Sequence, residues 1–316
     1  MLQVGFDIGG TNIAVGAVDE NHRIVARRDV RFPTGEPYAD TVVLMADLVR
    51  ELAAELNIDC NAFQSIGIAV PGSIDRSRTQ LLHAYNLQYH NVPLRACVRT
   101  HFPNIPVFLA NDADAAALAE LHAGAFYGKQ TAVLITLGTG IGGGLILGGR
   151  MFYGGMGNGV ELGHMVLQQG GTLCTCGTRG CIETLCTAIW LQQQGRRAVI
   201  DYPTAMLYTE TGGDINRVTA KLVIDCAKAG DAIARDIFTH YVDQLGSMVA
   251  SCIHFIDPET IAIGGGVSHA GEFLLAPLRK NVQKKCYYDR CGEIVAAQMG
   301  NDAGIVGAAM LARNSE

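Results

Sequence analysis

The strongest constraint on the fold is a segment that occurs twice in this chain of 316 residues. The first copy, LQVGFDIGGTNIAVGAV, occupies residues 2–18, and the second, TAVLITLGTGIGGGLIL, occupies residues 131–147. Each copy is an apolar run, a turn rich in glycine and threonine, and a second apolar run, which is typical of two strands joined by a turn. The offset of about 129 residues places Gly9 opposite Gly138 and Ile8 opposite Leu137, and it indicates an internal duplication.

The other segments alternate between strand-like and helix-like patterns. Short apolar runs predict further strands at residues 23–32, 65–70, 106–110, 260–264 and 293–298. A period of 3.6 residues predicts helices near 36–57, 93–101, 112–124, 183–197, 215–229, 231–256 and 270–287, and from residue 302 onward. We therefore expect an α/β chain with a small N-terminal domain over residues 1–113, joined by a C-terminal helix over 302–316, and a large domain over 114–301.

The composition argues against several classes of protein. Hydrophobic residues make up 49% and charged residues 17% of the chain, which predicts a globular protein. The formal net charge of −6 and the lack of Lys/Arg runs argue against a nucleic-acid partner and against an anionic membrane surface. Residues 131–149 carry no charge, but their seven glycines and three threonines favour buried strands over a membrane span.

The N-terminus and the cysteines bear on the compartment. Met1 leads directly into a strand-like run that contains Asp7, so we expect no signal peptide. Ten cysteines without such a signal favour reduced thiols. These features predict a cytoplasmic protein that does not associate with membranes.

A histidine and three cysteines form a candidate metal site. His164 precedes Cys174, Cys176 and Cys181, and the glycines between them permit sharp turns. Three thiolates and one imidazole are the ligand set of a closed tetrahedral zinc site, in which the metal is structural. The alternative is a set of thiols that bind no metal.

Glycine-rich turns follow three apolar strands, as DIGGT at residues 7–11, LGTGIGGG at 137–144 and GGG at 264–266. Glycine lets the backbone approach a ligand and turn its N–H groups toward an anion. None of the three matches the P-loop, and the first two lead into another strand, as hairpin turns do. Each could be a plain tight turn, but three at strand ends of a duplicated α/β chain favour phosphate binding.

Four motifs together give the chain a family resemblance. DIGGT, LGTGIGGG, the ELGH segment and the CxCGxxGCxE run resemble the ROK family of sugar kinases, and the likeness extends from Val4 to the closing NDAGIVGAA. Within the family it is closest to bacterial glucokinases. The resemblance implies the actin-like ATPase fold (ribonuclease H-like, hexokinase-type), with two duplicated α/β domains around a cleft and a zinc-bearing insert at 161–183.

The resemblance also assigns the chemistry. Asn111 and Asp112 lie where a predicted strand ends and a helix begins, so from the residues alone either could simply cap the helix. The pair matches the family's ND motif, which implies that Asp112 is the general base that takes the proton from the sugar hydroxyl. A kinase needs such a base, together with donors and Mg²⁺ on the phosphates.

Residue by residue, the family's motifs imply three sets of ligands. The sugar would be bound by Gly72, Asn86, Asn111, Asp112, Glu161, His164 and Glu183. ATP and Mg²⁺ would be bound by Asp7, Gly9, Gly10, Thr11, Gly138, Thr139, Gly140, Gly265 and Gly266. Structural Zn²⁺ would be bound by His164, Cys174, Cys176 and Cys181, with the second ring nitrogen of His164 facing the sugar. Tyr89 departs from the pattern, because many relatives carry tryptophan there.

The expected activity is ATP-dependent phosphorylation of a hexose, with D-glucose at its 6-hydroxyl as the first choice. N-Acetylmannosamine, mannose, fructose or allose are alternative substrates, because a single hydroxyl can decide specificity. A sugar-sensing repressor of the same family is disfavoured, because its DNA-binding domain would precede the turn that begins here at Asp7. An ATPase that binds no sugar is disfavoured by the cysteine run and the ND motif. Relatives imply a homo-oligomer, either a dimer or a tetramer.

Overall fold

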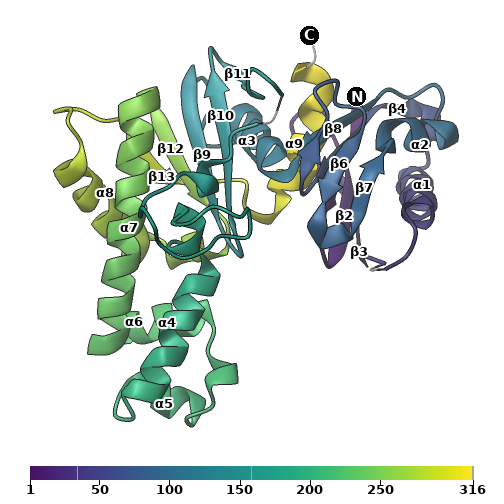
Figure 1. The fold of residues 1–316 in the computed structure, drawn as a ribbon. Helices are drawn as coiled ribbons and strands as arrows, with labels where there is room; N and C mark the ends of the chain where they lie inside the picture. Colours follow the sequence, from purple (N-terminus) through teal and green to yellow (C-terminus); the bar gives the residue numbers. More distant parts are fainter. Residues whose placement is uncertain (34, 158, 315–316) are drawn as a thin grey trace. The chain divides into compact units, whose positions relative to one another are not determined.

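The computed structural model describes residues 1–33, 35–157 and 159–314. Residues 315 and 316, the end of the predicted C-terminal helix, lie outside the described part. The described strands form two five-stranded sheets and one three-stranded sheet (Figure 1). No helix within these ranges is long and apolar enough to cross a membrane.

The first five-stranded sheet combines parallel strands with a hairpin edge. Its order is β3 (Ile24–Arg31), β2 (Asn12–Val18), β1 (Leu2–Ile8), β4 (Phe63–Val70) and β8 (Val107–Asn111). β1, β4 and β8 run parallel, whereas β2 pairs antiparallel with both β1 and β3. Apolar side chains of the central strands are fully buried, as at Phe6 and Ile68, so the core lies along this sheet.

The second five-stranded sheet repeats the same order. It contains β11 (Arg150–Met151), β10 (Ile141–Leu147), β9 (Thr131–Leu137), β12 (Thr260–Gly264) and β13 (Glu293–Ala296). β9, β12 and β13 run parallel, as their counterparts do. Each bound of β9 and β10 lies 129 residues after the matching bound of β1 and β2. The predicted duplication and the α/β class are therefore confirmed.

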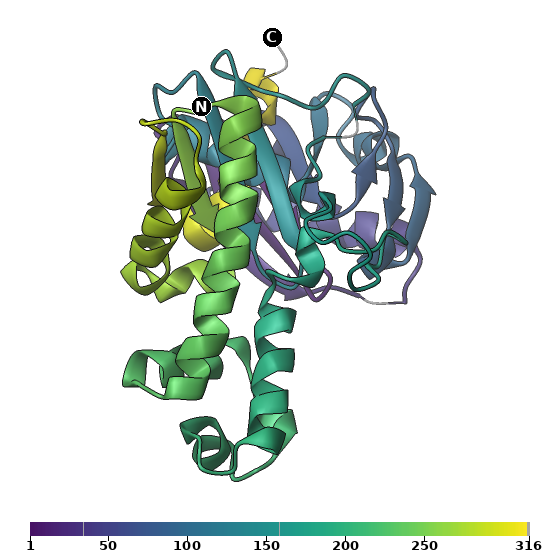
Figure 2. The ribbon, with the colours of Figure 1, turned by 60° about the vertical axis from the view of Figure 1, so that its left-hand side comes forward.

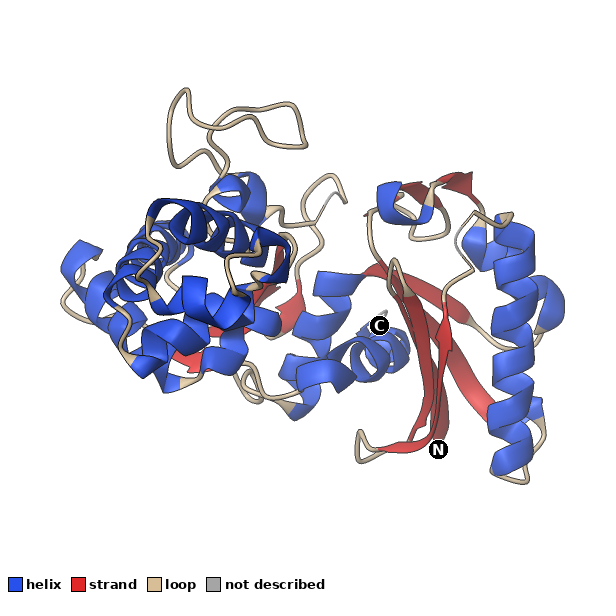
Figure 3. Ribbon diagram, turned by 90° about the horizontal axis from the view of Figure 1, so that it is seen from below, coloured by secondary structure: helices blue, strands red, loops and turns tan. Residues whose placement is uncertain are grey.

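Helices cover both faces of the sheet that contains the N-terminus (Figure 3). These helices are α1 (Tyr38–Glu55), α2 (Leu94–His101), α3 (Asp112–Ala123) and α9 (Ala303–Ala309). The remaining helices are α4 (Ala188–Asp201), α5 (Met206–Thr211), α6 (Ala220–Ala229), α7 (Ala232–Ile256) and α8 (Glu272–Lys285). α4, α6 and α7 pack against one another, and in Figure 2 they meet at the lower part of the long helix α7.

The C-terminal helix α9 lies directly on β1 and β4, which come from the other end of the chain. A Cβ atom added to Gly5 would lie 1.9 Å from the carbonyl oxygen of Ile305, and one added to Gly67 would lie 1.8 Å from that of Ala308. Side chains at either position would collide with backbone that cannot yield. Glycine is therefore required for this close packing.

The structure corrects several predicted bounds. The helix expected near 183–197 begins at Ala188, because the hydroxyl of Thr187 accepts a hydrogen bond from the N–H of Trp190 and caps it there. In the same way, Thr219 caps α6, so this helix does not begin at residue 215. The helix from residue 302 ends at Ala309 and continues as a 3₁₀ turn.

A three-stranded sheet was missed by the sequence analysis. It consists of β5 (Ser73–Ile74), β6 (Leu81–Ala84) and β7 (Tyr89–Val92), with a 3₁₀ turn between β6 and β7. These strands are too short for periodicity to identify them.

The chain divides into two compact units, which we call unit 1 and unit 2. Unit 1 contains Met1–Gln130, Gly144–Val160 and Gln298–Glu316. Unit 2 contains Thr131–Gly143 and Glu161–Ala297.

Candidate active site

The junction between β8 and α3 carries the predicted base. Oδ1 of Asn111 accepts a hydrogen bond from the N–H of Ala113 at 2.8 Å, so Asn111 caps α3. Its Nδ2 donates to the carbonyl oxygen of Gly72 at 3.1 Å. Oδ1 of Asp112 accepts from the same N–H of Ala113 at 2.9 Å. The capping role expected of one member of the pair thus belongs chiefly to Asn111.

Two aspartates of unit 1, Asp7 and Asp112, have raised pKa values, and the charge of Asp112 contributes to the shift of Asp7. Asp112 is exposed to solvent, yet many protein atoms surround its carboxyl group. The resulting desolvation raises the pKa of Asp112. Desolvation, followed by the charge of Asp112, raises the pKa of Asp7 to about 6, although Arg27 partly opposes this shift. A carboxylate with a raised pKa accepts a proton more readily near neutral pH, which suits a general base. The pair can supply one proton acceptor and one anionic ligand for a cation.

The DIGGT turn closes the hairpin between β1 and β2. The N–H of Gly9 donates to the carbonyl oxygen of Asn12 at 2.8 Å, which confirms the hairpin predicted for this turn. Thr11 is exposed at its tip. A Cβ added to Gly10 would lie 3.5 Å from that of Asn86. A residue predicted to bind phosphate and one predicted to bind sugar are therefore neighbours within unit 1.

Gly72 occupies a position that excludes other residues. Its φ angle is 114°, and an added Cβ would lie 2.0 Å from the carbonyl oxygen of His83. The close approach fixes the Gly72 loop against β6. Asn86 is exposed in the 3₁₀ turn after β6, and Tyr89, which begins β7, bonds through its hydroxyl to Oγ1 of Thr41 at 2.7 Å.

Two predicted nucleotide turns of unit 2 lie against each other. The N–H of Gly138 donates to the carbonyl oxygen of Gly140 at 3.0 Å, which closes the turn around the exposed Thr139. Gly265 has a φ of 77°, and a Cβ there would lie 2.5 Å from the carbonyl oxygen of Leu137. The exposed Gly266 follows it. Unit 2 thus brings the 138–140 turn and the 264–266 turn to one place.

Glu183 lies beneath the first of these turns. Its Oε2 accepts a hydrogen bond from the N–H of Ile141 at 3.0 Å, and a Cβ on Gly140 would lie 2.6 Å from this oxygen. Its Oε1 lies 3.8 Å from Sγ of Cys174. Glu183 therefore contacts both the turn and the cysteine cluster.

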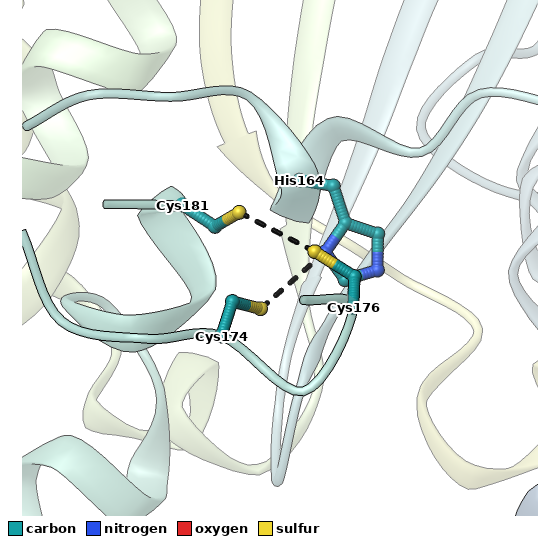
Figure 4. Close-up of side chains that lie close together, drawn as sticks. All are labelled: His164, Cys174, Cys176 and Cys181. Atoms are coloured by element: carbon teal, nitrogen blue, oxygen red, sulfur yellow. Dashed lines mark hydrogen bonds between the residues drawn. The ribbon is translucent and has the colours of Figure 1, made fainter. Parts of the chain in front are cut away.

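The four predicted zinc ligands converge (Figure 4). One ligand atom from each of His164, Cys174, Cys176 and Cys181 lies within 4.8 Å of all the others. Nδ1 of His164 is 3.7 Å from Sγ of Cys174, and the Sγ atoms of Cys176 and Cys181 are 3.6 Å apart. Tetrahedral zinc with bonds of ~2.3 Å to sulfur requires sulfur atoms about 3.8 Å apart. The cluster could therefore hold a metal ion with little rearrangement.

Backbone contacts give the cluster its shape. The N–H of Cys174 donates to the carbonyl oxygen of Thr178 at 2.8 Å. Gly180 has a φ of 82°, and an added Cβ would lie 1.7 Å from the carbonyl oxygen of Gln168. The neighbouring Cys181 pairs with Val166 in an isolated β-bridge. These turns direct the three thiols toward one another from a segment that has almost no regular secondary structure.

The predicted sugar-binding residues divide between the units. Unit 1 contains Gly72, Asn86, Asn111 and Asp112, and unit 2 contains Glu161, His164 and Glu183. Glu161 is exposed, and its carbonyl oxygen accepts a hydrogen bond from the N–H of His164 at 3.1 Å.

Two residues that shape the surroundings of Asp7 were missed by the sequence analysis. Arg27 forms ion pairs with Asp29 at 2.6 Å and with Asp302 at 2.7 Å, which places a cation near Asp7. A Cβ on Gly304 would lie 2.3 Å from the carboxyl carbon of Asp7. Arg27 left no signal in the sequence, whereas Gly304 belongs to the NDAGIVGAA segment and could have been found there.

Comparison with known proteins decides the family. The sequence matches the ROK family profile over residues 3–315. The chain belongs to the ROK family. This ROK protein is similar to the glucokinase of Thermotoga maritima, with 38% identity over 98% of this chain and 96% of that protein.

Two solved ROK structures are also similar. The ROK family glucokinase of Streptomyces griseus, in complex with glucose and AMPPNP, has a TM-score of 0.83 and 34% identity, and the match covers 99% of both chains. The ROK hexokinase of Thermus thermophilus has a TM-score of 0.84 and 30% identity, and the match covers 100% of both. The actin-like, hexokinase-type fold expected from the motifs is confirmed by these relatives.

Proposed function

We propose that this ROK protein is a glucokinase, which transfers the γ-phosphoryl group of ATP to the 6-hydroxyl of D-glucose and releases glucose 6-phosphate and ADP. The observation that carries the proposal is the Asp112 carboxylate, which is exposed at a strand-to-helix junction, has a raised pKa and lies near a second aspartate. The glucokinase of T. maritima and the S. griseus enzyme that binds glucose and AMPPNP support the choice of substrates.

In this proposal, Asp112 accepts the proton of the sugar hydroxyl as the oxygen attacks phosphorus. The Asn111 cap and its bond to Gly72 hold the junction, so Asp112 needs no reorganisation before proton transfer. Gly72, Asn86, Asn111, Glu161, His164 and Glu183 bind the sugar hydroxyls, and the carboxylates among them accept charge-assisted hydrogen bonds.

The phosphates are bound by the glycine-rich turns. The phosphates lie against the turns formed by Gly9, Gly10, Thr11, Gly138, Thr139 and Gly140, and Gly265 and Gly266 pass beneath the adenosine. The N–H groups of Gly9 and Gly138 close these turns, so the other N–H groups of the turns face the phosphate oxygens. Asp7 holds Mg²⁺ through water. Bound Mg²⁺ neutralises charge on the transferred phosphoryl group.

The cysteine cluster binds structural Zn²⁺. Three sulfur atoms and one imidazole nitrogen complete a closed site, so the metal has no open position for a reacting water. Glu183 follows Cys181 by two residues, and its Oε1 lies 3.8 Å from Sγ of Cys174. A metal that fixes the cysteine loop would therefore also restrict the position of this carboxylate, which supports a scaffold role. We further propose a cytoplasmic homo-oligomer, a dimer or a tetramer, with domains over 1–113 plus 302–316 and over 114–301.

A panel of sugars tests the proposal. ADP release with Mg-ATP is measured against glucose, mannose, fructose, allose and N-acetylmannosamine, and the product is identified by its reaction with glucose-6-phosphate dehydrogenase. We expect glucose to give the highest kcat/KM. A higher kcat/KM for another hexose would show that this hexose, and not glucose, is the preferred substrate. If no sugar causes ADP release, the proposed kinase activity is overturned.

A further inference from the structure

Arg78 connects two elements that meet at the predicted base. Its Nε donates to the carbonyl oxygen of Leu109 at 3.1 Å, near the end of β8. Its Nη2 lies 3.3 Å from Oδ2 of Asp114, a buried side chain in the first turn of α3. Asp112 lies between these two contact points in the chain. One guanidinium group therefore contacts both sides of the junction that carries Asp112.

The arginine is itself held in place. Its guanidinium carbon lies 3.4 Å from the centre of the Tyr153 ring, which restricts the side chain by stacking. Its backbone has a φ of 55° in a tight turn, and its N–H donates to the carbonyl oxygen of Asp75 at 2.8 Å. The carboxylate of Asp75 also accepts from the N–H of Thr79 at 2.7 Å. Such a turn keeps the side chain directed at the junction.

We propose that Arg78 is a positioning residue for Asp112. Together with the bond from Asn111 to Gly72, it ties the 72–80 loop to the strand-to-helix junction at two points. The inference rests on the proposed function, in which Asp112 is the base. Arg78 acts through geometry, because it holds the backbone of β8 and a side chain of α3 on either side of Asp112.

Lysine could not replace this arginine. The planar guanidinium presents Nε to one acceptor and Nη2 to another in a rigid fork, while its face stacks on a ring. A lysine ammonium retains the charge beside Asp114 but has no second, fixed donor for Leu109. A geometric role therefore predicts that Arg78→Lys is nearly as impaired as Arg78→Gln.

The experiment compares Arg78→Gln and Arg78→Lys with the control Arg76→Gln. Arg76 is an exposed arginine of the same turn. We expect both Arg78 variants to lose about 10–100-fold in kcat, because small displacements of a catalytic group are costly. KM for glucose and for ATP should stay within about 3-fold. The control should keep wild-type kinetics.

A double variant separates positioning from stability. Arg78→Gln should lower the melting temperature, because Asp114 loses the guanidinium that neutralises it. Arg78→Gln/Asp114→Asn should recover the melting temperature but not kcat, because the bond to Leu109 is still missing. If kcat recovers together with stability, Arg78 only neutralises Asp114 and the inference is overturned. Wild-type kcat in Arg78→Lys would overturn it as well.

Hydrogen exchange gives a readout that does not depend on activity. We expect the amides of residues 111–115 to exchange about 10-fold faster in Arg78→Gln than in the wild type or in Arg76→Gln. Unchanged exchange would refute the positioning role whether or not the protein phosphorylates a sugar. If the wild type phosphorylates no sugar but the amides of Arg78→Gln still exchange faster, the proposed function is overturned. The role of Arg78 in holding the strand-to-helix junction would then stand by itself.

Discussion

The carboxylate of Glu183 accepts a hydrogen bond from the backbone N–H of Ile141, with 3.0 Å between Oε2 and N. Its other oxygen lies 3.8 Å from Sγ of Cys174. Residues that are about forty positions apart in the sequence are therefore joined beside the 138–140 turn. A residue that the motifs assign to the sugar also supports a turn assigned to phosphate.

Two substitutions of Glu183 should have different effects. The amide introduced by Glu183→Gln can still accept from Ile141 but cannot bind sugar hydroxyls as a charged acceptor, so we expect KM for glucose to rise about 10–100-fold. Glu183→Ala also removes the bond to the turn, so KM for ATP should rise as well. Steady-state kinetics with each substrate varied in turn measure both effects. If the two substitutions change KM for ATP equally, Glu183 does not support the 138–140 turn through its bond to Ile141.

Removing the proposed base should abolish most of the turnover. Asp112→Asn keeps the size and the acceptor for the N–H of Ala113, so the fold should remain. We expect kcat to fall by about 10²–10⁴-fold, the usual contribution of a general base. Circular dichroism checks the fold, and single-turnover assays measure the chemical step. Near-normal turnover would show that another group takes the proton.

The raised pKa of Asp7 should make stability depend on pH. Its folded pKa is about 6, against an ordinary value of 3.8, so the folded state binds the proton more tightly than the unfolded state does. Stability should therefore decrease as the pH rises from about 4 to about 6. Asp7→Asn removes this penalty, and above pH 6 it should be more stable than the wild type by at most about 3 kcal/mol.

Urea unfolding of both proteins at several pH values, without ATP or Mg²⁺, measures the difference. It should be close to zero at pH 4 and largest at pH 8. The same substitution should lower turnover, because an amide is a poor ligand for Mg²⁺. A stability difference that does not change with pH would contradict the electrostatic origin.

Loss of one thiol should remove the metal and impair the sugar site together. Cys181 is fully buried, and its sulfur is 3.6 Å from that of Cys176. We expect Cys181→Ser to contain less zinc by elemental analysis, to melt at a lower temperature and to lose turnover. The matched control is Cys291→Ser, an exposed cysteine outside the cluster. Lost zinc with unchanged turnover would refute the scaffold role.

Local patterns predicted the strands well but not the small sheet. β9 spans the seven residues that the repeated segment indicated, because its apolar run is buried in a parallel sheet. The sequence did not predict β5, β6 and β7, since strands of two to four residues are too short to show a hydrophobic period. Helix starts were misplaced where a threonine cap, as at Thr187, outweighed the apolar pattern.

The duplicated α/β plan, the hairpin turns and the four possible metal ligands could be derived from the order of the amino acids alone. These follow from spacing and residue type, which act over short stretches of chain. Three relationships became visible in the folded chain: Asp112 raises the pKa of Asp7, Glu183 accepts a hydrogen bond from Ile141, and Arg78 donates one to Leu109. Such relationships join residues distant in sequence. They arise when sheets and helices pack to bury apolar surface, because that packing sets which polar groups share a desolvated environment.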